Sequence, residues 1–207
     1  MKLLHAPTSP FVRKVMVVAH EAGLADQIEC VFNAASPLQR DPDLIDCNPL
    51  GKIPALIVED GVTLFDSPVI CEYLAARGNN TALYPPIGPA RWAALTQQAL
   101  GDGLLDAAIA GRYEMLMRPE EFRWAGWRDV QIAKVNGALA RIETLAPTLG
   151  QQPTIGTITL GCALGYLDFR YGDLDWRSGR PAAADWFAAF DERPSMATTR
   201  PREHVPA

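Results

Sequence analysis

The sequence contains little cysteine, little histidine and no long apolar stretch, and each shortage excludes a class of protein. The four cysteines and three histidines form no C-x-x-C pair and no spacing typical of metal ligands, which argues against a dithiol redox centre and a metal site. No apolar run approaches the length of a membrane span, and no signal peptide precedes the first predicted strand. We therefore expect a cytoplasmic protein that binds no metal and no membrane.

Charge of one sign is not in large excess either. The chain has 19 Lys and Arg against 24 Asp and Glu, for a net charge of −5. A weakly acidic protein has no electrostatic attraction to nucleic acid or to an anionic membrane surface. The 207 residues are 48% hydrophobic, which is enough to bury a sizeable core in one large domain or two small ones.

The cysteines are predicted to be structural. Cys30, Cys71 and Cys162 each lie in an apolar run, and free cysteine is among the residues most often buried. We expect reduced thiols in the core.

Patterning in the first 78 residues alternates between strand-like and helix-like segments. Short apolar runs next to Pro and Gly predict strands, and apolar residues at helical spacing predict helices. The predicted strands are 2–5, 28–32, 55–58 and 62–64, the predicted helices are 10–22 and 67–77, and 37–47 is a loop with one helical turn. The resulting order is βαβαββα.

Strand signals end at a proline-rich stretch, 79–89, which we interpret as a linker. Four helical runs follow, at 90–117, 119–145, 154–171 and 182–191. Pro194, Pro201 and Pro206 then fragment the end of the chain, and we expect the last residues to be loose. The sequence thus predicts a domain at 1–78, a linker at 79–89 and an all-α domain at 90–207.

The third of these helices is predicted to be a buried core helix. It is apolar on several sides, and Thr154 at its start is a favourable N-cap. Thr157 stands where a capping box would place a residue with a longer polar side chain, so we expect a somewhat weaker cap.

Three short segments suggest a binding site. Asn48 to Leu56 is a turn that leads into a strand through Ile53 and Pro54. If the bond between Ile53 and Pro54 is cis, Ile53 turns its N–H and C=O outward, where they can pair with an extended peptide-like ligand.

The second segment, Phe65 to Pro68, leads into the predicted helix 67–77 and includes its first two residues. Ser67 and the helix N-terminus suit a ligand carboxylate, and Asp66 suits an amino group. The alternative is ordinary capping, with Ser67 as N-cap and Asp66 in solvent.

The third segment, Thr8 to Val15, joins the first strand to the first helix. Pro10 fits the first helical position, which makes Ser9 the N-cap. A serine cannot carry out thiol–disulfide exchange, but it can donate a hydrogen bond to a sulfur anion. Ser9 could instead only cap the helix, and Thr8 is a competing donor.

Taken together, these three segments resemble the glutathione S-transferase family, in a bacterial cytosolic form with serine at the active-site position, and the resemblance covers the whole chain. It implies a thioredoxin-like N-terminal domain followed by an all-α domain, with glutathione as co-substrate and Ser9 as the donor to its thiolate. The glutathione-binding residues that it implies are Phe11, Lys52, Ile53, Asp66 and Ser67.

The resemblance further implies a hydrophobic electrophile bound between the domains, and a homodimer. Asp102 and Asp106 share a helix face, and in relatives a carboxylate from this helix can line the cleft or reach the ligand of the partner subunit. A polar helix face is the alternative. Arg13 and Lys14 are expected to lie on a solvated face.

Two other functions remain open on the sequence. A non-catalytic binding or stress-response interaction protein could keep the same motifs, and tight glutathione binding without turnover would favour it. A glutaredoxin-like reductase is disfavoured because no cysteine stands at position 9.

Overall fold

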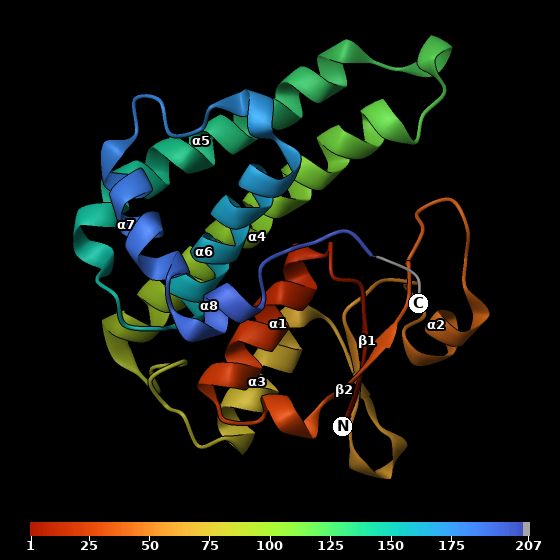
Figure 1. Cartoon of the computed structure of the whole chain (residues 1–207), viewed down its shortest axis with the longest axis vertical. Helices are drawn as coiled ribbons and strands as arrows, with labels where there is room; N and C mark the ends of the chain where they lie inside the picture. Colours follow the sequence, from red (N-terminus) through yellow and green to blue (C-terminus); the bar gives the residue numbers. More distant parts are fainter. Residues whose placement is uncertain (205–207) are drawn as a thin grey trace.

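A small mixed sheet flanked by helices forms the first part of the protein in the computed structural model, which describes residues 1–204 (Figure 1). The elements follow the predicted order closely. They are β1 (Lys2–His5), α1 (Pro10–Glu21), the 3-10 helix η1 (Ala25–Gln27), β2 (Glu29–Phe32), α2 (Pro42–Cys47), β3 (Ala55–Ile57), η2 (Glu59–Gly61), β4 (Thr63–Leu64) and α3 (Ser67–Arg77).

The strand order in the sheet is β2-β1-β3-β4. β1 runs parallel to β2 and antiparallel to β3, with Leu4 opposite Ala55. β3 is antiparallel to β4, with Leu56 opposite Leu64. The last residues of β1 and of β4 therefore lie beside the first residues of β3, at the same end of these three strands.

Helix α1 begins where the sequence predicts. Ser9 is the N-cap, and its Oγ accepts the Val12 N–H at 3.3 Å. The apolar residues Val15 and Val18 are fully buried in the core.

Helix α3 has its predicted bounds and ends before Gly78. The glycine is needed for packing, because a Cβ there would lie 2.5 Å from the carbonyl oxygen of Ala22. The left-handed residue at this helix end is Asn79, with φ 52°.

The rest of the described chain is helical and packs beside α1 and α3 (Figure 1). Its elements are α4 (Gly88–Leu116), η3 (Glu120–Phe122), α5 (Ala125–Leu149), α6 (Ile155–Arg170), η4 (Gly172–Leu174), α7 (Pro181–Asp191) and α8 (Pro194–Thr198). The predicted core helix is confirmed, because every residue of α6 from Ile155 to Leu167 is buried.

The cap of α6 is complete. Thr157 accepts the Thr154 N–H at 2.8 Å, and Thr154 accepts the Thr157 N–H at 3.2 Å. A threonine thus closes the capping box.

Two predictions for the helical part are wrong. Helix α5 begins at Ala125 instead of Pro119, because the buried Glu114 carboxylate accepts the Trp124 N–H at 2.7 Å and fixes the chain just before the helix. The end of the chain is also more ordered than expected, since Pro194 starts α8 and Met196 is fully buried. The expectation of loose final residues falls on 205–207, outside the described residues.

The expectation for the cysteines holds in part. Cys71 and Cys162 are fully buried, and burial raises the pKa of Cys71 to about 12 and that of Cys162 to about 11. Cys30 is exposed, which contradicts the prediction, because β2 is an edge strand of the sheet. Among the helices of residues 1–204, none combines the length and apolarity needed to span a bilayer.

Candidate functional site

The three predicted segments meet at one end of the strands β1, β3 and β4. Ser9 follows the end of β1, Ile53 precedes the start of β3, and Asp66 follows the end of β4. Because β3 is antiparallel to both neighbours, these three chain ends are adjacent. Residues separated by more than fifty positions in the sequence are thus gathered beside the N-termini of α1 and α3.

Ser9 is half-buried at the start of α1. Its Oγ already accepts the Val12 N–H, but within residues 1–204 its O–H donates to no protein group. Capping uses a lone pair of the hydroxyl and leaves the proton for a ligand. Thr8 is also half-buried, so Ser9 and Thr8 both remain candidates for the donor.

The bond between Ile53 and Pro54 is cis, as the sequence analysis considered. Among the described residues, the N–H and C=O of Ile53 form no backbone hydrogen bond. The turn before it is held by Asn48, which is 1% exposed, donates from Nδ2 to the Lys52 carbonyl at 2.7 Å and accepts the Leu50 N–H at 3.1 Å. The Lys52 side chain is exposed.

Asn48 was not predicted as a functional residue. Its position next to Pro49, within a turn, was a signal that it fixes the backbone there.

The start of α3 differs from the capping alternative. Asp66, not Ser67, is the N-cap residue, and neither side chain makes a capping hydrogen bond. Asp66 is exposed and Ser67 is 2% exposed. The peptide bond between Phe65 and Asp66 is cis. Within the described chain, both side chains are therefore left without a protein partner beside the positive end of a helix.

The expectation for Arg13 and Lys14 is wrong, because both are buried. Lys14 is 0% exposed, and its Nζ lies 2.6 Å from Oδ1 of Asp102 on α4. Arg13 is 4% exposed and lies 2.7 Å from Asp191 on α7, while it also donates to the Met196 carbonyl.

A third ion pair also ties α1 to the helical part. Glu21 pairs with Arg193 at 3.1 Å and accepts the Ser195 hydroxyl. Three charged residues of α1 thus reach α4, α7 and the segment at the start of α8.

Asp102 therefore serves first as the counter-ion of Lys14. Burial raises the pKa of the Asp102 carboxyl, the Lys14 ammonium opposes this rise, and the charges of Asp106 and Asp66 add to it. The influence of Asp66 places Asp102 in the electrostatic neighbourhood of the candidate site. A role for Asp102 in lining the cleft stays a prediction.

Phe11, the remaining predicted residue, packs against the hydrophobic core, and its ring centroid lies 5.7 Å from the Lys14 ammonium nitrogen. Among residues 1–204, no group of three or more His, Cys, Asp or Glu side chains is arranged to hold a metal ion.

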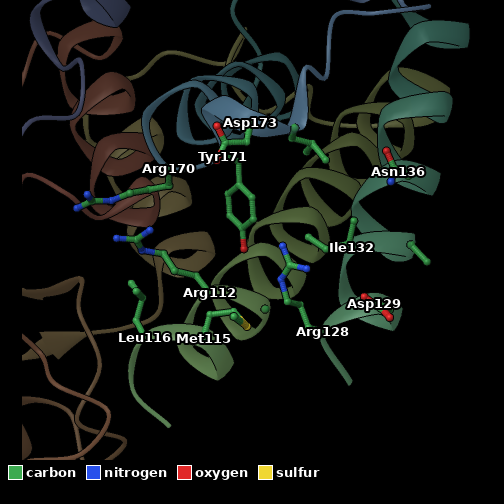
Figure 2. Close-up of a pocket in the computed structure, with 13 residues that line it drawn as sticks. Arg112, Met115, Leu116, Arg128, Asp129, Ile132, Asn136, Arg170, Tyr171 and Asp173 are labelled. Carbon is green, nitrogen blue, oxygen red and sulfur yellow. The ribbon is translucent and has the colours of Figure 1, made fainter. Parts of the chain in front are cut away.

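A cavity of about 480 Å³, which the sequence analysis did not find, lies between α4, α5 and the end of α6 (Figure 2). Its volume is within the range of small-molecule pockets. Arginines from three different helices line it, and no local motif connects them.

Two family models match the chain. Residues 8–77 match the one described as "Glutathione S-transferase, N-terminal domain", and residues 125–189 match "Glutathione S-transferase, C-terminal domain". Both matches agree with the division into a sheet-containing part and a helical part.

Similar proteins cover almost the whole chain. "Uncharacterized GST-like protein YibF" from Escherichia coli (strain K12) is 33% identical over 97% of this chain and 98% of that protein. A solved glutathione transferase family member from Pseudomonas fluorescens Pf-5 with bound glutathione is 44% identical, with a TM-score of 0.94 over 97% of this chain and 98% of that one. A structure from the same organism with bound S-(propanoic acid)-glutathione is 43% identical, with a TM-score of 0.90 over 98% and 100% of the two chains.

Proposed function

Because this chain belongs to the glutathione S-transferase family, we propose that it binds glutathione and joins the glutathione thiolate to an electrophilic small molecule. In this reaction the thiolate sulfur forms a bond to an electrophilic carbon, and the leaving group departs with the electron pair of its own bond. A related glutathione-dependent reduction is the other reaction in this class. The bound S-(propanoic acid)-glutathione of the Pseudomonas relative supports conjugation, since that ligand carries a carbon substituent on sulfur.

The observation that carries the proposal is the convergence of the three segments beside the first residues of β3. Glutathione has a peptide middle and a zwitterionic end. The unpaired backbone groups of Ile53 suit the cysteinyl segment, and Asp66 suits the γ-glutamyl ammonium group. Ser67 and the α3 N-terminus suit the γ-glutamyl carboxylate, and Lys52 suits the glycyl carboxylate.

Ser9 is proposed as the donor to the thiolate, with Phe11 as a neighbouring contact. A free thiol has a pKa of about 8.5, so only a few per cent is ionised at neutral pH. Lowering this pKa by about two units requires roughly 2.7 kcal/mol of preference for the thiolate. One hydrogen bond to a charged group contributes about 1.5–3 kcal/mol, and the α1 dipole adds about 0.3–1 kcal/mol.

The same proposal assigns residues 1–78 to a glutathione-binding domain, 79–89 to a linker and 90–207 to a helical domain that holds the second substrate. Homodimerisation and a cytoplasmic location are parts of this proposal by family analogy.

Calorimetric titration of glutathione and of S-methylglutathione tests the ligand, and the ultraviolet absorbance of the bound thiolate tests Ser9. We expect both ligands to bind, and we expect Ser9→Ala to lose the thiolate absorbance while it keeps most of the affinity. Thr8→Ala is the matched control. A thiolate signal that disappears in Thr8→Ala and persists in Ser9→Ala would transfer the role to Thr8.

Asp66→Ala is expected to weaken glutathione binding strongly. The exposed carboxylate has no protein partner among the described residues, so its loss should affect the ligand and not the fold. Asp26→Ala, which removes an exposed carboxylate from η1, is the control for net charge. Wild-type affinity in Asp66→Ala would refute the assignment of the γ-glutamyl site.

A further inference from the structure

The cavity between α4, α5 and the end of α6 combines apolar walls with arginines (Figure 2). Met115, Leu116 and Ile132 supply apolar surface, and Arg112, Arg128 and Arg170 also line the cavity. Such walls suit a ligand that has an apolar body and a polar group.

Of the three arginines that line the cavity, Arg112 and Arg128 form no ion pair within residues 1–204, although the charge of Arg112 also helps to lower the pKa of Glu203. Neither side chain makes a hydrogen bond or an ion pair among residues 1–204, whereas Arg170 pairs with Glu203. Asp129 also lines the cavity, but it is next to Arg128 on α5, and consecutive residues of a helix do not face each other. Asp173, the other carboxylate of the lining, makes no ion pair with these arginines.

In Figure 2 the hydroxyl of Tyr171 points toward α4 and lies on the side of Arg128, whereas the guanidinium of Arg112 points toward Arg170. Burial raises the pKa of Tyr171, and the positive charges of Arg112 and Arg128 oppose this rise. The hydroxyl donates to the Ala108 carbonyl, which holds the ring in place. An anion bound in this cavity would therefore meet cations contributed by α4, α5 and α6.

One wall of the cavity is connected to the segment that carries Ser9. Arg170 forms an ion pair with Glu203, and the adjacent Arg202 N–H donates to the Pro7 carbonyl at 3.4 Å. Pro7 is two residues before Ser9 in the sequence. Residues 202 and 203 thus link the Arg170 side of the cavity to the segment just before Ser9.

We propose that this cavity binds the acidic group of the second substrate, so that the electrophile is an anionic molecule with an apolar body, with Arg112 and Arg128 as its recognition residues. The inference rests on the proposed transferase function and refines it, since the family resemblance implied only a hydrophobic electrophile. The apolar body would lie against Met115, Leu116 and Ile132.

The test compares two stable product analogues, so it requires no turnover. S-(para-carboxybenzyl)glutathione and S-benzylglutathione are titrated calorimetrically into the wild-type protein, with glutathione alone as a reference. We expect the carboxylated conjugate to bind about tenfold more tightly, which corresponds to the lower end of the contribution of one hydrogen bond between charged groups.

The variant is Arg112→Gln combined with Arg128→Gln. It should lose the preference and keep the wild-type affinity for S-benzylglutathione, which also shows that it is folded. Arg141→Gln removes an exposed arginine of α5 that does not line the cavity, and it should keep the preference.

Equal affinities for the two conjugates in the wild-type protein would overturn the inference and leave the proposed function intact. A preference that survives in the double variant would overturn the assignment to these arginines. Failure of glutathione itself to bind would overturn the proposed function, and the inference with it.

Discussion

Removing the Lys14 ammonium while Asp102 stays in place is expected to destabilise the protein strongly. Lys14 Nζ and Asp102 Oδ1 are 2.6 Å apart, and the side chains are 0% and 19% exposed. With an effective dielectric constant of about 20, their attraction at this distance is roughly 6 kcal/mol. Desolvation costs several kcal/mol for each ion, so the intact pair adds little net stability.

Breaking the pair has a much larger effect than its net contribution. In Lys14→Met the Asp102 carboxylate keeps its desolvation cost without its cation, which typically costs about 3–5 kcal/mol. In a chain of 207 residues each kcal/mol shifts the melting temperature by roughly 2–4 °C. We therefore expect a fall of about 6–20 °C in Lys14→Met, and we expect Asp102→Asn in the same background to recover much of it.

The pH dependence of the free energy of unfolding provides a separate test of this prediction. Burial already raises the pKa of Asp102, and loss of the ammonium should raise it further. Between the ordinary pKa of the carboxyl and this raised value, the folded state binds more protons than the unfolded state, so stability increases as the pH falls. The deficit of Lys14→Met should therefore be largest at neutral pH and should shrink in mild acid.

Thermal and urea unfolding of the wild type, both single variants and the double variant measure these quantities. A Lys14→Met protein as stable as the wild type at neutral pH would refute the reasoning. So would a deficit that grows as the pH falls.

The remaining predictions concern packing, capping and thiol access. Gly101→Ala should lower the free energy of unfolding in urea by about 1–3 kcal/mol, because its Cβ would lie 2.8 Å from a side chain of α6. A Cβ at Gly103 meets nothing within 4 Å, so Gly103→Ala should stabilise the protein by about 0.5–1 kcal/mol. Equal effects of the two substitutions would argue against close contact of α4 and α6. Thr157→Ala should lower stability by about 0.5–2 kcal/mol by opening the α6 capping box, and an unchanged unfolding midpoint would contradict this. Iodoacetamide should modify the exposed Cys30 in the native protein and spare the two buried cysteines until denaturant is added, as mass spectrometry of the peptides would show.

The parts of the fold that could be predicted are those set by local signals. Helix α3 has its predicted bounds because Pro68 marks its first turn and Gly78 follows its last residue. The start of α5 could not be predicted, because it depends on the hydrogen bond from Trp124 to Glu114, ten residues earlier on another helix. Pro119 alone therefore predicted the wrong first residue for this helix.

Buried charge on α1 was hidden from the sequence for the same reason. The partners of Lys14 and Arg13 are 88 and 178 positions away in the sequence. Without knowledge of these partners, a charged residue is predicted to lie in solvent. Only the fold shows that carboxylates of α4 and α7 meet these cations.

The candidate site divides in a similar way. Ser9, Ile53 and Asp66 each lie in a short motif, and the strand order of the sheet then brings the motifs together. The arginine cavity has no such motif, since Arg112 and Arg128 come from separate helices. A motif search therefore finds the glutathione side of a proposed two-substrate site and misses the other side.

The three ion pairs of α1 have a consequence for cooperativity. Because Arg13, Lys14 and Glu21 all find their counter-ions in the helical part, the sheet-containing part cannot detach without exposing or stranding buried charge. Both parts should unfold in one transition, in spite of the proline-rich segment between them. A fragment that ends before α4 would carry two uncompensated cations on its main helix, so a protease cut in 79–87 should leave two pieces that stay associated and melt together.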